Sequence, residues 1–103
     1  MIRIIQIDGS TTDKYFIHQP PYNDQLREWI GCEFIEIVRV FYDGKYERLI
    51  VDETSALKKD KVVNQAATNI YHENARVHAP YMLIDAPPVY GVAVLLTGEH
   101  KLT

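Results

Sequence analysis

Residues 34–52 read FIEIVRVFYDGKYERLIVD, with runs of β-branched and aromatic residues on either side of Asp43-Gly44. An Asp-Gly pair in this setting is the strongest short signal for a β-hairpin, because a type I′ turn requires positive φ at both central residues. The stretch therefore predicts two antiparallel strands, over residues 33–42 and 46–52. The rest of the chain is expected to pair with this hairpin or to cover one of its faces.

A two-residue turn would fix the register of the hairpin and place Arg39 directly opposite Arg48. The same face would also carry Ile35, Ile37, Phe41, Tyr46 and Ile50. Like charges opposite each other across two strands are destabilising, so something is expected to relieve this pair. In one interpretation a carboxylate of the chain does so, or a bulge shifts the register. In the other interpretation the pair binds a phosphate-bearing ligand or an acidic partner.

Two helices and a last strand complete the expected fold. Residues 24–30 carry an apolar stripe with Gly31 as the C-cap, and residues 64–75 carry a second stripe with Asn64 as the N-cap. The final strand, residues 90–97, is apolar on both faces, which is typical of the middle of a sheet or of a subunit contact. Residues 2–7 also read as a strand, with 15–17 and 81–84 as further candidates. We predict an α+β fold in one domain, 1–103: a small, mostly antiparallel sheet with a central hairpin, covered by two helices.

Composition narrows the class of protein. The chain has 103 residues, 11 basic and 14 acidic side chains and a net charge of −3, a balance that disfavours a nonspecific nucleic-acid binder. The single cysteine, Cys32, excludes an internal disulfide, and with no signal-peptide pattern it indicates a cytoplasmic protein. The longest apolar run, Val92 to Leu96, is far shorter than the roughly 20 residues of a membrane helix, so no membrane contact is expected.

No reactive constellation stands out in the sequence. His72 and His78 are six positions apart, which is not the i, i+4 spacing that places two metal ligands on one helix face. Cys32 lacks a matching histidine and acid, and Asp52 and Glu53, adjacent in a strand, would point to opposite faces. We therefore predict no catalytic residue, no metal site and no cofactor.

Binding residues are better indicated. Lys58, Lys59 and Lys61 form a basic cluster that is either a solvated loop or a phosphate site. The high tyrosine content favours contact surfaces and predicts a homo-oligomer. The candidate ligand- or partner-binding residues are Arg39, Arg48, Tyr46, Lys58, Lys59, Asn64, Thr68 and Tyr71. Two of them, Asn64 and Thr68, also have a structural interpretation as a helix cap and a helix-packing residue.

Five segments resemble, in order, a family of small domains common in phages and mobile elements, the "domain of unknown function 3846" family. The segments are residues 26–31, 34–38, 50–53, 63–71 and 89–95. The most specific pieces are Val51-Asp52-Glu53 after the hairpin and the Asn-x-x-Ala-Thr pattern of residues 64–68. The resemblance spans most of the chain and implies a phage or bacterial origin and an α+β fold. It supplies no activity and no catalytic residue.

Three functions follow as hypotheses. The first is a non-catalytic binding protein of phage or mobile-element type that inhibits or modulates a host defence or regulatory protein. The second is an oligomeric sponge that sequesters a nucleotide-type signalling molecule, with arginine for the phosphates and aromatic rings for the base. The third is a nucleic-acid-associated accessory protein, which the acidic balance disfavours.

Overall fold

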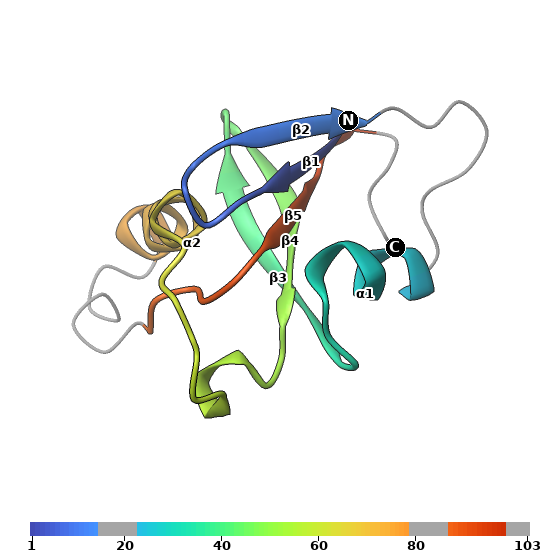
Figure 1. Ribbon diagram of the computed structural model, residues 1–103. Helices are drawn as coiled ribbons and strands as arrows, with labels where there is room; N and C mark the ends of the chain where they lie inside the picture. Colours follow the sequence, from blue (N-terminus) through green and yellow to red (C-terminus); the bar gives the residue numbers. More distant parts are fainter. Residues whose placement is uncertain (15–22, 79–86, 99–103) are drawn as a thin grey trace.

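The computed structural model of the chain describes residues 1–14, 23–78 and 87–98. They form one five-stranded antiparallel sheet with two α-helices, an α+β fold as predicted (Figure 1). The strands are β1 (Ile2–Ile5), β2 (Thr11–Lys14), β3 (Ile35–Tyr42), β4 (Lys45–Asp52) and β5 (Ala93–Leu96), in the sheet order β2-β1-β5-β4-β3. The helices are α1 (Asn23–Ile30) and α2 (Gln65–His78), with a short 3-10 helix at Ser55–Leu57. The strand candidates at 15–17 and 81–84 lie outside the described residues.

The hairpin of β3 and β4 has the predicted turn and register. Asp43 and Gly44 both have positive φ, 52° and 79°, as a type I′ turn requires. Arg39 lies directly opposite Arg48, so no bulge shifts the pairing. The hairpin is not central, however: β3 is the last strand of the sheet, and β5 is its middle strand. The burial of all four β5 residues follows from this position between β1 and β4.

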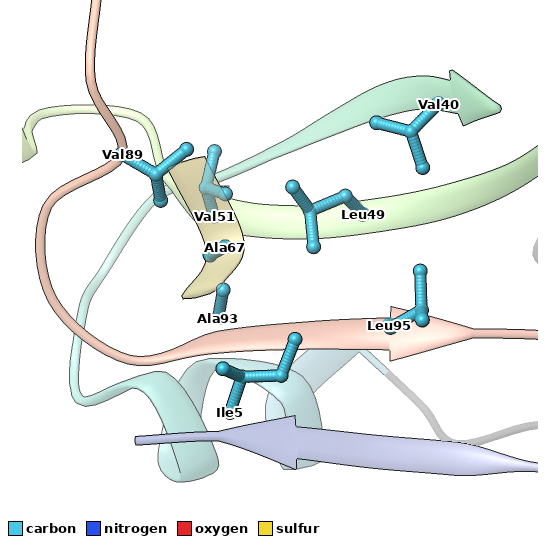
Figure 2. Packing of buried hydrophobic residues seen from close by; sticks show 8 residues of the cluster. All are labelled: Ile5, Val40, Leu49, Val51, Ala67, Val89, Ala93 and Leu95. Carbon is cyan, nitrogen blue, oxygen red and sulfur yellow. The ribbon is translucent and has the colours of Figure 1, made fainter. Parts of the chain in front are cut away.

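The helices cover opposite faces of the sheet. On the face covered by α2, the fully buried Leu49 and Leu95 pack with Ala67 of the helix (Figure 2). On the other face, Leu26 and Ile30 of α1 pack against Ile50 and other strand residues. This second cover is incomplete, because α1 has only 8 residues and packs beside one end of the hairpin. Toward the turn, Ile37 remains 47% exposed.

Asn64 fixes the start of α2. Its side-chain oxygen accepts a hydrogen bond from the Ala67 amide at 3.0 Å, which is the geometry of an N-cap. Its amide nitrogen donates to the carbonyl oxygens of Ile5 and Gly91 at 3.0 and 2.9 Å. One fully buried side chain therefore ties the helix to β1 and to the segment that leads into β5. The helix begins one residue after the predicted position and extends three residues further, to His78.

The ends of the predicted elements differ slightly from those observed. The first helix begins at Asn23 and ends at Ile30, and the Gly31 amide donates to the Arg27 carbonyl at 2.7 Å. The last strand is shorter than residues 90–97, because Tyr90 forms only an isolated bridge with Val63. Gly91, with φ of 78°, interrupts the strand between this bridge and Ala93.

Candidate functional site

Five residues near the hairpin turn share the face of the sheet that α1 leaves partly uncovered. They are Ile37, Arg39, Phe41, Tyr46 and Arg48, and we call them the hairpin surface. Ile37 and Tyr46 are 47% and 37% exposed, Arg39 is exposed, and Arg48 is half-buried. The sequence predicted that these residues share a face. It did not single out Ile37, although the shortness of the first helix could have indicated that the far end of this face stays uncovered.

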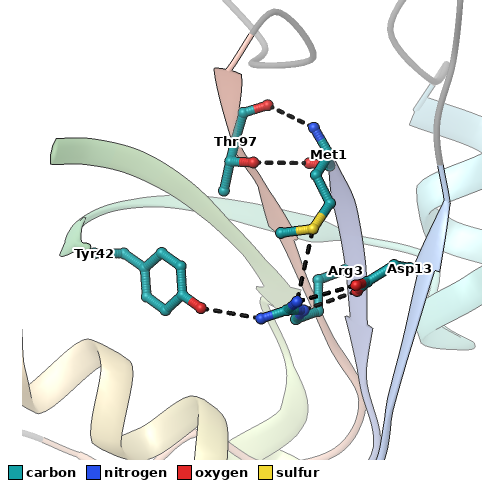
Figure 3. Close-up of polar contacts among 5 residues, drawn as sticks. All are labelled: Met1, Arg3, Asp13, Tyr42 and Thr97. Carbon is teal, nitrogen blue, oxygen red and sulfur yellow. Dashed lines mark hydrogen bonds and ion pairs between the residues drawn. The ribbon is translucent and has the colours of Figure 1, made fainter. Parts of the chain in front are cut away.

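The described arginine side chains fall into two kinds. Arg3 is held by Asp13 through hydrogen bonds of 2.8 and 3.0 Å and also donates to the Tyr42 hydroxyl at 3.0 Å (Figure 3). The hydrogen bond with Arg3 lowers the pKa of the Asp13 carboxyl. Arg27 likewise forms an ion pair with Asp24. In the described part of the chain, by contrast, no carboxylate lies within ion-pair distance of Arg39 or Arg48.

An aromatic pair, Tyr46 and Phe41, lies beside Arg39 on this surface. The Arg39 guanidinium lies over the ring of Tyr46, 3.8 Å from its centroid. Phe41 and Tyr46 meet edge to face, with ring centroids 5.4 Å apart. A cation over an aromatic ring contributes about 0.5–1 kcal/mol at an exposed site, but it neutralises neither positive charge. The hairpin surface is therefore cationic, aromatic and partly apolar.

The opposed arginines should cost the protein stability. We expect Arg39→Glu to raise the free energy of unfolding by about 1 kcal/mol, because it replaces a like-charge pair with an opposite-charge pair across the strands. Urea denaturation measures this change. Lys59→Glu, the same change of charge at an exposed loop residue, is the control and should stay within about 0.5 kcal/mol of the wild type. A loss of stability in Arg39→Glu greater than the about 0.5–1 kcal/mol of the removed contact with Tyr46 would show that the chain itself neutralises the pair.

The predicted lysine candidates lie apart from the hairpin surface. Lys58 Nζ contacts Oδ2 of the buried Asp52 at 2.5 Å, and the Thr54 amide donates to Oδ1 at 2.9 Å. Burial raises the pKa of the Asp52 carboxyl, but the hydrogen bonds from Lys58 and Thr54 outweigh burial and hold this pKa below its usual value. Asp52 and Arg48 are four residues apart, about 13 Å along an extended strand. Lys58 thus forms an ion pair at the end of β4, and the exposed Lys59 follows it in the loop.

The remaining candidates are inside the fold or on its other face. Asn64 and Thr68 are buried, and Thr68 Oγ1 accepts a hydrogen bond from the Val89 amide at 2.8 Å. Tyr71 packs against the core on the α2 face. These three residues therefore do not join the hairpin surface, and for Asn64 and Thr68 the structure agrees with the interpretation as cap and packing residue.

A hollow of the described part lies beside α1 and not at the hairpin surface. Its volume is about 810 Å³, and its lining includes Arg27, Cys32, Phe34 and Lys58. Burial raises the pKa of the Cys32 thiol, and the nearby Asp52 charge raises it further, so the neutral thiol is favoured over the nucleophilic thiolate. A smaller cavity of about 190 Å³ lies on the α2 face between Val38, Tyr71 and Val89.

Comparisons with protein-family models, with curated proteins and with solved structures found no match to this chain. The resemblance to the "domain of unknown function 3846" family therefore stays a prediction. Within residues 1–14, 23–78 and 87–98, no histidine, cysteine or acidic side chains gather in a group of three that could hold a metal ion. No helix of this described part combines the length and apolar character needed to span a bilayer.

Proposed function

We propose that this chain is a protein-binding module and that the hairpin surface binds an acidic segment of a partner protein. One observation carries the proposal: Arg39 and Arg48 face each other on an exposed sheet face without a carboxylate from the described chain, whereas Arg3 and Arg27 each have one. An acidic partner would supply the missing negative charge. The arginine and tyrosine side chains of this surface are types enriched at the energetic centres of protein interfaces.

The shape of the surface favours a macromolecular partner over a nucleotide. Small-molecule sites are concave and bury most of the ligand, but neither of the two cavities described above is lined by Arg39, Tyr46 or Arg48. In addition, one face of the Tyr46 ring is already covered by Arg39, so that this face cannot stack on a base. Ile37, an exposed aliphatic side chain, fits an apolar contact with protein better than a contact with phosphate.

The proposal extends the first of the sequence-based hypotheses. The resemblance to phage-associated domains makes a host protein the expected class of partner. Binding alone would then be the mode of action, through occupation of an acidic segment that the host protein needs for its own contacts.

A peptide selection tests the proposal. A randomised peptide library is selected on the immobilised full chain, on Arg39→Glu/Arg48→Glu and on the control Lys45→Glu/Lys59→Glu. Both double variants make the same change in net charge, but Lys45 lies on the opposite face of the hairpin and Lys59 lies in a loop. We expect the wild type and the control to enrich peptides with acidic residues. The arginine variant should bind them about 100-fold more weakly, the loss typical when one side of a charge pair is reversed at an interface.

Two results would contradict the proposal. One is that the wild type enriches no acidic residues or no peptides at all. The other is that the two double variants bind the enriched peptides equally well, since the charge of the hairpin surface would then be irrelevant. Circular dichroism of each variant establishes that the comparison is made between folded proteins.

A further inference from the structure

Among the described strands, β3 is the last of the sheet, and the direction of its backbone hydrogen bonds can be derived. The Glu53 amide donates to the Phe34 carbonyl at 3.0 Å, just before the first ladder pair, Ile35 opposite Asp52. In an antiparallel pair, residues alternate between those that exchange hydrogen bonds with the partner strand and those that do not. Phe34 and the even-numbered residues of β3 therefore bond to β4. The amide and carbonyl groups of the odd-numbered residues point away from β4, where no other described strand pairs with β3.

These outward-facing residues also supply much of the hairpin surface. The side chains of Ile37, Arg39 and Phe41 lie on the face that α1 covers only in part. Their backbone amides and carbonyls point to the outer edge of the strand. The strand is 8 residues long and has no proline, and its charged side chains are the exposed Glu36 and Arg39, on opposite faces. One extended segment could thus engage the backbone and the arginines together.

We infer that the acidic partner segment binds as an additional β-strand along the outer edge of β3, with an Asp or Glu directly opposite Arg39. This inference rests on the proposed function and specifies its geometry. Residues directly opposite in a hydrogen-bonded antiparallel pair have Cα atoms about 5.5 Å apart and side chains on the same face, so the carboxylate would reach the Arg39 guanidinium. Residues two positions away on the added strand would lie beside Ile37 and Phe41. The bound sequence therefore reads apolar-x-acidic-x-apolar.

Charge favours such a segment over a second copy of this chain. Antiparallel self-pairing of Ile35–Tyr42 centred on Val38 or Arg39 would bring the Arg39 side chains of both copies close to the symmetry axis. Four arginines, two from each hairpin, would then gather with no described carboxylate among them. An acidic strand from another protein neutralises the pair and removes the repulsion.

A backbone substitution tests the inference with a matched control. Ile37→Pro removes the outward-facing amide and leaves the ladder to β4 intact, because this amide does not bond to β4 and proline is tolerated on the solvent side of an edge strand. Ile37→Ala removes the same side chain and keeps the amide. We expect a peptide enriched on the wild type to bind Ile37→Pro roughly five- to tenfold more weakly than Ile37→Ala, the effect of one lost hydrogen bond.

Amide hydrogen exchange in the wild type gives a second measurement that does not depend on the folding of a variant. Adding the enriched peptide should slow exchange at the Ile37 and Arg39 amides. If the peptide binds through Arg39 and Arg48, but neither amide is protected and the two Ile37 variants bind equally, the strand geometry is wrong and the proposed function stands. If no acidic peptide binds the wild type, the strand geometry and the proposed function are both wrong.

Discussion

Replacement of Asn64 by alanine is expected to lower the free energy of unfolding by about 3 kcal/mol. The Asn64 side chain is fully buried and makes three hydrogen bonds: it accepts one from the Ala67 amide and donates to the carbonyls of Ile5 and Gly91. Loss of the cap costs about 1 kcal/mol, and each of the two carbonyls, one buried and one partly buried, costs about 1 kcal/mol more when it is left without its donor. Urea denaturation of the purified variant measures the sum.

Two further variants separate the roles of this residue. Asn64→Asp keeps a good N-cap acceptor but cannot donate to the two carbonyls, so it should lose at least as much stability as alanine at neutral pH. Asn69→Ala removes the same side-chain type from an exposed position of α2 and should change stability by less than about 0.5 kcal/mol. If Asn64→Asp were as stable as the wild type, the cap alone would account for the residue.

Leu49→Ala is the other large expected loss, about 3–4 kcal/mol. Leu49 is fully buried on the α2 face, opposite Leu95 of the middle strand, where the surrounding β-strands leave little room for collapse around a cavity (Figure 2). Leu57→Ala is the matched control, since Leu57 is 86% exposed and its truncation should be nearly neutral. Thermal and urea unfolding of both variants give the comparison. Equal losses at the two positions would contradict the assignment of the core.

Local patterns predicted the elements of the fold well. The Asp43-Gly44 turn fixed the hairpin register, which brought Arg39 and Arg48 together. The spacing of Leu26, Trp29 and Ile30 predicted the face of α1 that packs on the sheet, with Leu26 and Ile30 buried and Trp29 partly buried. Each of these features depends on residues close together in the sequence, so the turn chemistry and the helical period suffice to find them.

The arrangement of the elements was less predictable. The position of the hairpin at the end of the sheet depends on β5 pairing with both β1 and β4, and no local pattern encodes that choice. β2 consists of four exposed polar residues with no apolar alternation, and beside its ladder with β1 it is held by the contact of Arg3 with Asp13. The different roles of the clustered lysines were likewise not predictable, because the ion pair of Lys58 with Asp52 is visible only in the structure.

The most direct test of the account is the dissociation constant of one enriched acidic peptide for the wild type, Arg39→Gln and Lys45→Gln. Both substitutions remove a single positive charge from the same hairpin, one on each face. We predict that Arg39→Gln weakens binding about tenfold and that Lys45→Gln changes it by less than about twofold, because only Arg39 faces the bound carboxylate. Equal affinity of the wild type and Arg39→Gln would contradict the assignment of the hairpin surface as the binding site.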